Sequence, residues 1–437
     1  MRKGSPLFYG WVIVGASFIW FSIAYGVRYS FSVFYPAILD DFGWSRAGTA
    51  SILSVNMIVY GLTAPLAGTL VDRFGPRRVL TFGAILLVLG TAAASQAREI
   101  WQFYLTYGVL TAAGTCMAGS TPTLTILSNW FIKRRGAAVG IFSAGTGLSF
   151  VYAIFVERLI FHIGWPATYL VLAATVALIV LPLVALIPRP RPQDMGLLPD
   201  GDKEQTATAE VPTAQRAVLD EKWASTSWTL PKAVKTYRFW TLFFAFFCTL
   251  GIGWTLVAAH QVKFLEDAGS TRMFAAIIYG LYGVMFVIGN LCGFISDRIG
   301  RETAFTVGSI WCILGVFFLL LVGKTSAPWL PFLYAIAFGL GMGICLPTLP
   351  ASATDLFQGK NFGSIMGSQV LGFALGGFLG PWLGGWIYDV SGSYTSAFIL
   401  VIVAFAAAVV LLWIASPGKI RPVTGKLHRA TRQPLGP

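Results

Sequence analysis

Twelve apolar segments, each long enough to cross a lipid bilayer, follow one another along this chain of 437 residues. A membrane-spanning helix needs about 20 apolar residues, because it must satisfy its own backbone hydrogen bonds where no water is present. Charged residues make up 11% of the chain, whereas soluble domains are about a quarter charged. The sequence therefore predicts an all-α membrane protein. The predicted spans are 9–35, 47–71, 77–97, 101–130, 134–158, 165–187, 238–264, 273–295, 303–323, 328–354, 361–386 and 393–415.

Basic residues are distributed unevenly, since 24 of the 31 Lys and Arg residues lie in the even-numbered loops and the two termini. The positive-inside rule places the side richer in Lys and Arg in the cytoplasm. We therefore expect a multi-pass protein of the cell membrane, specifically a bacterial inner membrane, with both termini in the cytoplasm. The net charge of +13 reflects this topology, so we expect no nucleic-acid partner.

A short charged motif occurs twice, as GTLVDRFGPRR at 68–78 and as GFISDRIGRE at 293–302. The Asp-Arg pairs in the two copies are 225 positions apart, about half of the chain, and both copies lie between apolar segments. An internal repeat of this size indicates two similar six-helix bundles. Such bundles are typical of transporters that rock around a central site.

A polar stretch rich in Pro, Thr, Gln, Glu and Lys separates the sixth and seventh spans and is predicted to be a cytoplasmic linker. The predicted domains are an N-terminal bundle at 1–187, the linker at 188–237, a C-terminal bundle at 238–416 and a cytoplasmic tail at 417–437. The five cysteines fall inside predicted spans without CxxC spacing. We therefore expect no disulfide, no metal site and no cofactor.

The repeated motif resembles the signature of the major facilitator superfamily, in which this turn closes a cytoplasmic gate. The resemblance covers essentially the whole chain. It implies twelve transmembrane helices in two pseudo-symmetric bundles of six. The residues that the resemblance assigns to the gate are Gly68, Asp72, Arg73, Gly75 and Arg77 in the first copy, and Gly293, Asp297, Arg298 and Gly300 in the second.

Two further stretches resemble one branch of that superfamily, the monocarboxylate porters and their oxalate/formate antiporter relatives. YGWVIVGASF at 9–18, continued by SFSVFYPAILDDFGWSRAGTASI at 30–52, is similar to their first span and loop. NWFIKRRGAAVGIFSAGTGLS at 129–149 is similar to the start of their fifth span. The resemblance implies a secondary transporter of small organic anions. We expect no enzyme, because the sequence has no nucleophile elbow or phosphate-binding loop.

Arg28 is the charge placed deepest within a predicted span. An uncompensated ion at membrane depth costs about 2.5–3.5 kcal/mol or more and is usually functional. A guanidinium does not escape this cost by losing its proton, so it needs an anion or a polar cavity. Arg28 is a candidate to bind a substrate carboxylate with two hydrogen bonds. A fixed partner within the protein, or snorkelling to the interface, remains the alternative.

His260, near the external end of the seventh span, is a candidate to carry a transported proton or to bind an acid. A histidine facing the aqueous interface is the alternative. Glu157 and Arg158, at the external end of the fifth span, are interpreted as an interface ion pair, with a proton carrier as the less favoured role. Polar and aromatic candidates around a central cavity, each also open to a structural role, are Asn56, Tyr60, Tyr107, Tyr279, Tyr282, Asn290, Tyr334 and Gln369.

The sequence departs from the family that it resembles at two places. Animal monocarboxylate carriers have a buried Asp-Arg pair in the eighth span, whereas the span 273–295 is uncharged and has only Asn290 in that region. The oxalate branch places a Lys in the eleventh span, yet no cation lies between Lys360 and Asp389. A dianionic substrate is therefore disfavoured, and a monocarboxylate bound mainly by Arg28 is predicted.

The predicted function is secondary active transport of a small organic anion by alternating access, with protons as a possible coupling ion. No carboxylate lies deep in any predicted span, so protons would move on His260 or with the substrate. The partners that we expect are the substrate, protons and the lipid bilayer, around a monomer. An exporter of amphipathic drugs or metabolites is the alternative.

Overall fold

The structure, a computed structural model of the chain, describes residues 8–131, 134–201, 220, 223, 225–292, 295–323, 327–357 and 362–420. Every regular element in these ranges is a helix. Ten helical segments of the described residues are long and apolar enough to cross a membrane. The prediction of an all-helical membrane protein is therefore confirmed.

Two of the predicted spans are merged and one is divided. The fifth and sixth fall on one helical stretch of 50 residues, Ala137–Leu186, which turns at Gly164 (φ +76) just before Pro166. Glycine adopts this left-handed conformation without strain, and proline is suited to the first turn of the helix that follows. The predicted span at 101–130 is divided among four shorter helices and is not among the ten candidate spans.

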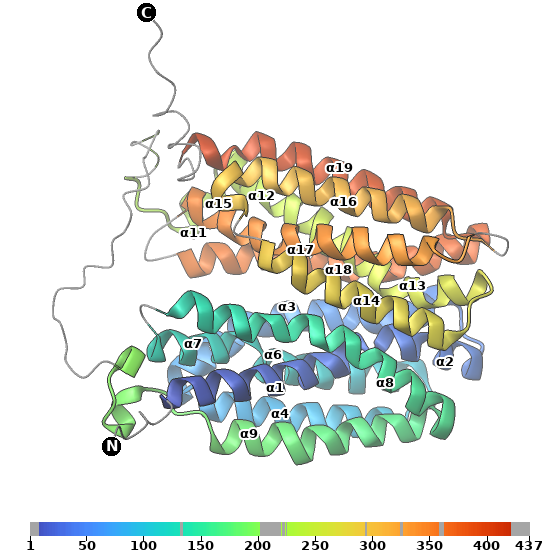
Figure 1. The fold of residues 1–437 in the computed structure, drawn as a ribbon, viewed down its shortest axis with the longest axis horizontal. Helices are drawn as coiled ribbons and strands as arrows, with labels where there is room; N and C mark the ends of the chain where they lie inside the picture. The colour runs from blue at the N-terminus through green and yellow to red at the C-terminus, as the bar shows by residue number, and fades with distance from the viewer. Residues whose placement is uncertain are drawn as a thin grey trace, which may run out of the picture. The chain divides into compact units, whose positions relative to one another are not determined.

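The chain divides into two compact units, and the residues of each unit contact mainly one another. The first unit consists of Met1–Phe42 and Val55–Thr208. Within this N-terminal unit the long helices lie side by side, with α1 against α8 and α4 against η1 and α6 (Figure 1). Its described elements, including most of α3, are α1 (Tyr9–Tyr29), α2 (Phe31–Phe42), α3 (Arg46–Phe74), α4 (Pro76–Ala94), α5 (Ile100–Phe103), η1 (Tyr104–Thr111), α6 (Ala112–Met117), α7 (Ser120–Trp130), α8 (Arg135–Thr175), η2 (Val176–Val180), α9 (Leu181–Leu186), η3 (Pro192–Met195) and η4 (Pro199–Gly201).

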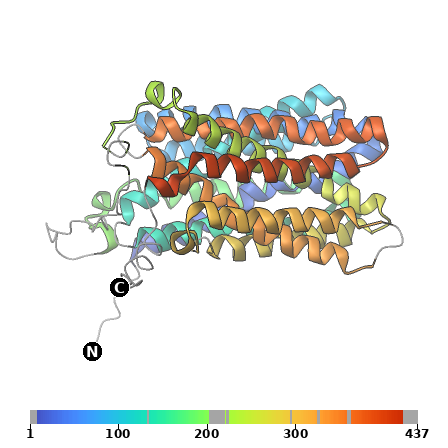
Figure 2. The same ribbon diagram turned by 90° about the horizontal axis from the view of Figure 1, so that it is seen from above.

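The second unit consists of Gly43–Ser54 and Ala209–Pro437, so it includes the first turns of α3. Within this C-terminal unit α17 packs against α14 and α16, and α18 packs against η5 (Figure 2). Its other described elements are α11 (Leu230–Ala233), α12 (Tyr237–Phe246), η5 (Phe247–Trp254), α13 (Thr255–Asp267), α14 (Arg272–Leu291), α15 (Ile295–Ile299), α16 (Arg301–Leu320), α17 (Leu330–Phe357), α18 (Phe362–Ser391), α19 (Thr395–Ala415) and η7 (Pro417–Lys419).

Glycine allows a close helix contact in the C-terminal unit, between η5 and α18. A Cβ atom added to Gly251 would lie 2.5 Å from the Cα atom of Gly376. In lipid the hydrophobic effect does not drive helices together, so close backbone approach is a main source of packing energy. The glycines of α18 therefore have a packing role at this contact.

Several predicted features lie outside the described residues. They are most of the linker, at 202–219, 221–222 and 224, the tail beyond 420, and Gly293 of the second motif. The predicted domain boundaries stay a prediction.

Candidate substrate site

Arg28 lies in the last turn of α1 and is 2% exposed. The helix ends at Tyr29 and is capped by Ser30, whose hydroxyl donates to the carbonyl oxygen of Gly26 at 2.6 Å. Gly26 also allows α8 to approach closely, since a Cβ atom there would lie 2.7 Å from Cδ1 of Tyr152. The tight packing of α1 and α8 thus holds the arginine inside the N-terminal unit.

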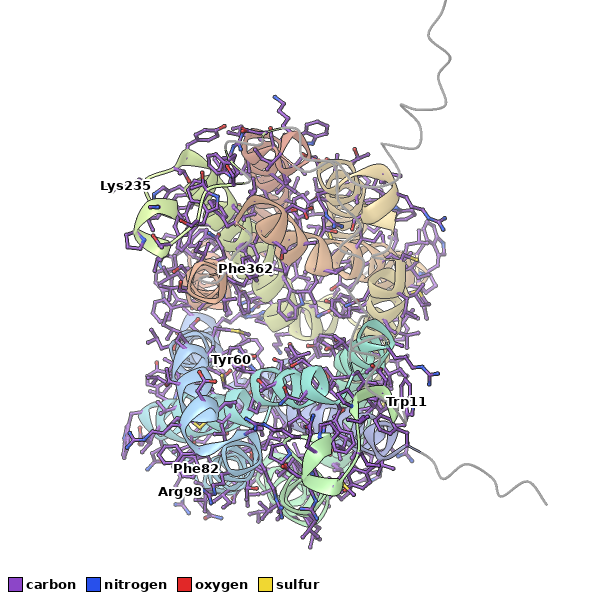
Figure 3. All side chains as sticks on the ribbon, turned by 90° about the vertical axis from the view of Figure 1, so that its left-hand side faces the viewer. Trp11, Tyr60, Phe82, Arg98, Lys235 and Phe362 are labelled. Carbon is purple, nitrogen blue, oxygen red and sulfur yellow. The ribbon has the colours of Figure 1, made fainter. Side chains whose placement is uncertain are left out.

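Three side chains of α3 contact the guanidinium group of Arg28. Its Nε donates to Oδ1 of Asn56 at 3.0 Å, and its Nη2 lies 3.1 Å from Sδ of Met57. Its Cζ lies 3.9 Å from the centre of the Tyr60 ring, within cation–π distance. Figure 3 looks along the helices and labels Tyr60 on α3.

Tyr107 of η1 completes this group, which we call the Arg28 cluster (Arg28, Asn56, Met57, Tyr60 and Tyr107). The Tyr107 hydroxyl donates to the carbonyl oxygen of Arg28 at 2.5 Å. Its own carbonyl oxygen accepts from Nδ2 of Asn56 at 2.9 Å. Asn56 is 0% exposed, so both ends of its amide are committed and its orientation is fixed. These hydrogen bonds orient the members of the cluster relative to one another, as a selective binding site requires.

All partners of the Arg28 guanidinium are neutral. Among the described residues, no carboxylate lies within 4.0 Å of it. An arginine has five N–H donors, and the contacts with Asn56 and Met57 use Nε and one terminal nitrogen. A buried cation without a counter-ion is costly, and an incoming carboxylate would offset that cost. The cluster is therefore suited to bind an anion.

His260 is 0% exposed in the C-terminal unit, which rules out the alternative of a histidine facing water. Its Nδ1 lies 3.1 Å from the Tyr394 hydroxyl, and its Nε2 lies 2.7 Å from the carbonyl oxygen of Pro381. Because a carbonyl oxygen only accepts, Nε2 carries the hydrogen in this arrangement. A role of His260 in substrate or proton binding stays a prediction.

The other predicted site residues of the C-terminal unit are mostly buried in its helix contacts. Tyr279 and Tyr282 stack with ring centres 6.0 Å apart, and the Tyr334 hydroxyl donates to Oε1 of Gln261. Gln369 donates weakly to the carbonyl oxygen of Phe239, at 3.4 Å. These four predicted residues are 0% exposed, whereas Asn290 is half-buried. Their binding role stays a prediction.

The predicted ion pair between Glu157 and Arg158 is wrong. Glu157 is 3% exposed, whereas Arg158 is exposed to the surroundings and makes no ion pair with another described residue. Successive residues of an α-helix point about 100° apart, so the two side chains leave α8 in different directions. Glu157, at the end of the predicted fifth span, is nevertheless buried within the helical stretch Ala137–Leu186.

The first gate motif forms the turn between α3 and α4. Gly75 has φ +82, which favours glycine, and Nε of Arg77 donates to the carbonyl oxygen of Ala185 at 2.7 Å. Asp72 and Arg73 are exposed, and Gly68 is half-buried. In the second copy Arg298 is exposed, and the side chain of Asp297 lies outside the described residues. The gating role of both copies stays a prediction.

Sequence reasoning missed a buried ion pair beside the second motif. Nε of Arg301 donates to Asp355 at 2.9 Å, and Nη1 donates to the Ser296 hydroxyl at 2.6 Å. Arg301 is 4% exposed and Asp355 is 2% exposed. Arg301 belongs to the repeated motif, but Asp355 follows the predicted tenth span by one residue, which placed it in a loop.

A second missed cluster joins the first turn of α3 to the rest of the C-terminal unit. Nη1 of Arg46 donates to the Asp267 carboxylate and to the Tyr394 hydroxyl. The Arg46 guanidinium also lies 3.5 Å from the centre of the Tyr388 ring. The sequence places Arg46 between the first two predicted spans, and hydropathy does not show which acidic residues approach it.

The pattern of the Major Facilitator Superfamily matches residues 17–367 and 291–436 of the chain. Monocarboxylate transporter 13 of Bos taurus is 26% identical over 407 residues, which cover 90% of this chain and 86% of that protein. Its Rattus norvegicus counterpart is 25% identical over 394 residues, 90% of this chain and 85% of that protein. Human monocarboxylate transporter 2 is 25% identical over 374 residues, 82% of this chain and 75% of that protein.

Solved transporter structures share the fold. A bacterial homologue of the human lysosomal transporter Spinster, in an inward-facing and unoccupied conformation, gives a TM-score of 0.65 at 17% identity over 95% of this chain and 97% of that one. A variant of the nucleoside transporter NupG gives a TM-score of 0.69 at 15% identity, over 93% of this chain and 98% of that one.

The chain belongs to the Major Facilitator Superfamily. It is a multi-pass membrane transporter and not an enzyme, and within the superfamily it is similar to monocarboxylate porters. The resemblance seen in the sequence is therefore confirmed.

Proposed function

We propose that this transporter moves a small organic anion, a monocarboxylate, across the membrane by alternating access. Arg28 binds the carboxylate through its guanidinium. Asn56 orients that guanidinium, and Tyr107 bonds to Asn56 and to the backbone of Arg28. The observation that carries the proposal is the burial of Arg28 among neutral partners of the described residues. The monocarboxylate transporters among the relatives support the substrate class.

The Arg28 cluster contains a single cation, which favours a substrate with one negative charge, since a second carboxylate would enter the site without a partner. One aromatic ring lies against the cation, and the next residue of α1 belongs to a stacked aromatic pair. Tyr60 lies against Arg28, and Tyr29 stacks on Phe150 with ring centres 4.5 Å apart. These apolar faces favour a carboxylate that carries a short hydrocarbon or aromatic group.

The test is uptake of radiolabelled lactate, pyruvate and benzoate into proteoliposomes that contain the purified protein, with and without a pH gradient. We compare the wild type with Arg28→Gln, Arg28→Lys and the matched control Arg158→Gln, which removes an exposed arginine of the same unit. We expect saturable uptake that Arg28→Gln abolishes and Arg158→Gln leaves unchanged. Arg28→Lys keeps the charge but loses the fork of two donors, so its KM should rise.

Unchanged uptake by Arg28→Gln would remove Arg28 from the site. The absence of any carboxylate uptake by the wild type, together with drug resistance of cells that express it, would favour an exporter of amphipathic compounds. Thermal stability of each variant in detergent separates a lost binding site from a misfolded protein.

A further inference from the structure

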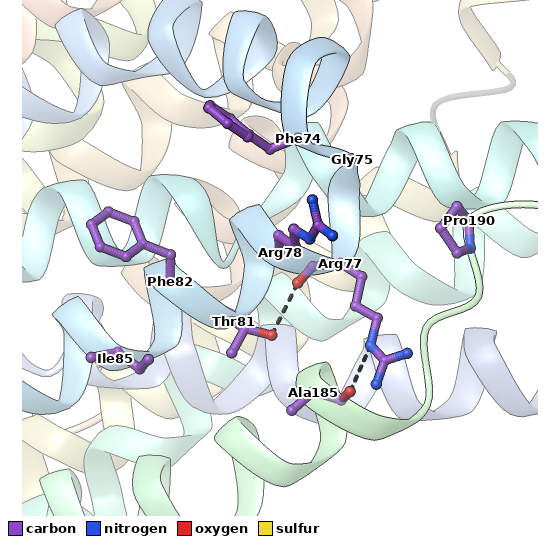
Figure 4. Close-up of a pocket in the computed structure, with 9 residues that line it drawn as sticks. All are labelled: Phe74, Gly75, Arg77, Arg78, Thr81, Phe82, Ile85, Ala185 and Pro190. Atoms are coloured by element: carbon purple, nitrogen blue, oxygen red, sulfur yellow. Dashed lines mark hydrogen bonds between the residues drawn. The ribbon is translucent and has the colours of Figure 1, made fainter.

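A cavity of about 790 Å³ opens on the surface of the N-terminal unit, where α4 begins (Figure 4). Its lining comes from the turn before α4, the first turns of α4, the end of α9 and Pro190. No member of the Arg28 cluster contributes to it. The proposed transport function therefore leaves this cavity unexplained.

Two adjacent arginines, Arg77 and Arg78, form the polar end of the cavity. The bond from Nε of Arg77 to the carbonyl oxygen of Ala185 fixes its guanidinium and leaves the terminal nitrogens available. Arg78 is exposed. Among the described residues, no carboxylate forms an ion pair with either arginine. This end of the cavity therefore presents two positive charges that an anion can neutralise.

Apolar side chains form the opposite end of the cavity, as Figure 4 shows for Phe82 and Ile85. Arg78, Phe82, Ile85 and Leu89 are spaced by four, three and four residues, so they follow one face of α4. Phe82 is 52% exposed, Ile85 is 40% exposed and Leu89 is 55% exposed. They belong to the membrane-spanning helix Pro76–Ala94, and Phe82 lies on the outer side of its unit in Figure 3. An apolar stripe on a membrane span is a lipid-facing surface.

We propose that this cavity binds an anionic phospholipid of the surrounding membrane. Arg77 and Arg78 bind the phosphate, and one acyl chain lies along Phe82, Ile85 and Leu89. A guanidinium matches the geometry of a phosphate with two parallel hydrogen bonds. The start of α4 adds the positive end of a helix dipole, which also favours an anion.

The apolar stripe distinguishes a lipid from a free phosphate ion as the occupant. A free phosphate would use the two arginines and leave the rest of the cavity to water. A phospholipid fills both ends, because its phosphate lies at the interface while its chains extend into the bilayer. Basic residues beside a membrane span favour anionic over neutral headgroups by direct charge attraction.

The test uses the purified full-length protein in detergent, titrated with fluorescent phosphatidylglycerol and, separately, with fluorescent phosphatidylcholine. The variants are Arg77→Gln/Arg78→Gln, Phe82→Ser and the control Arg98→Gln, an exposed arginine beyond the other end of α4. We expect the Kd for phosphatidylglycerol to rise at least about tenfold in the double variant, to rise less in Phe82→Ser and to stay unchanged in Arg98→Gln. Phosphatidylcholine should bind more weakly than phosphatidylglycerol to the wild type.

Competition with inorganic phosphate shows whether the cavity binds the phosphate of a lipid or a free phosphate ion. We expect millimolar phosphate to leave lipid binding nearly unchanged. Displacement of the lipid by phosphate at low concentration, or equal lipid affinity of the double variant and the wild type, would overturn the proposal. The charge-retaining variant Arg77→Lys/Arg78→Lys should lose less affinity than the Gln variant, and an unchanged melting temperature of the Gln variant in detergent shows that its loss is not misfolding.

Discussion

Asn56 decides how Arg28 presents its charge. The amide accepts from Nε of Arg28 through Oδ1 and donates to the carbonyl oxygen of Tyr107 through Nδ2. A carbonyl group at this position orients the guanidinium but adds no negative charge. The substrate carboxylate would therefore be the first anion to reach the arginine.

Asn56→Asp should convert this partner into a fixed counter-ion of nearly the same shape. An aspartate at hydrogen-bond distance would neutralise Arg28 and compete with the substrate carboxylate. We expect saturable uptake of the best monocarboxylate to be lost or its KM to rise at least about tenfold. The melting temperature in detergent is measured alongside, because the variant loses the Nδ2 donor to the carbonyl oxygen of Tyr107. Asn129→Asp, at an exposed asparagine of the same unit, serves as the control. A wild-type KM in Asn56→Asp would argue against an anion at Arg28.

Glu157 is the buried carboxylate among the described residues of the N-terminal unit and is a candidate to carry a proton. Burial of an ionisable group in a membrane span usually marks a functional site. We expect Glu157→Gln to abolish the stimulation of uptake by a pH gradient while exchange of labelled for unlabelled substrate continues. Arg158→Gln, at the exposed neighbouring position, should keep the stimulation. Full stimulation in Glu157→Gln would exclude this residue as the carrier.

The sequence showed which residue to examine in the site, but not how it is surrounded. Arg28 stands out because charges are rare in apolar segments and each one must be compensated. Its contacts with Asn56 and Tyr107 depend on the rotation of three helices about their axes, which hydropathy does not determine. The same limit explains Glu157, since its burial depends on which side of α8 faces the other helices.

At the scale of the helix, a substitution of Gly376 tests the close contact between α18 and η5. In Gly376→Ala the new Cβ would overlap the carbonyl oxygen of Phe247, which is backbone and has little freedom to move. Overpacking of this kind costs about 1–3 kcal/mol. We expect a lower melting temperature in detergent. Gly367→Ala, in the same helix with no atom within 4 Å of the new Cβ, should not lower it.

The first turn of α3 is held within the C-terminal unit by charges as well as by packing. The Asp389 carboxylate accepts from the backbone nitrogens of Arg46 and Ala47, at 3.0 Å and 2.8 Å. A carboxylate at the start of a helix is stabilised by the helix dipole. The Arg46 side chain adds its ion pair with Asp267.

Arg46→Gln should therefore lower the thermal stability of the protein. The ion pair is partly exposed, at 13% for Arg46 and 29% for Asp267, so the loss should be about 1 kcal/mol. A thermal-shift measurement in detergent checks this, with Arg98→Gln as the control because no described residue pairs with that side chain. Equal melting temperatures of the two variants would mean that the Arg46 side chain adds little to the stability of the protein.

At the scale of the whole molecule, hydropathy predicts the all-helical membrane fold but not the positions at which the helices break. Hydropathy identifies apolar segments because lipid admits few charges, and this is enough to predict an all-helical membrane protein. It does not report backbone conformation. The turn at Gly164 and the division of 101–130 into α5, η1, α6 and α7 therefore emerge from the structure.

The orientation of the molecule in the membrane follows from its loops, and it sets which leaflet supplies the lipid proposed at Arg77 and Arg78. The positive-inside rule places the α3–α4 turn and the start of α12 in the cytoplasm, and the loop after α4 outside. Lys235 and Arg98 are exposed reporters of these two sides. We expect Lys235→Cys to react with a membrane-impermeant maleimide in right-side-out vesicles only after permeabilisation, and Arg98→Cys to react at once. The parent for both variants replaces Cys248 and Cys292, the partly exposed native cysteines, by Ser. The reverse labelling pattern would invert the topology and move the proposed lipid site to the outer leaflet.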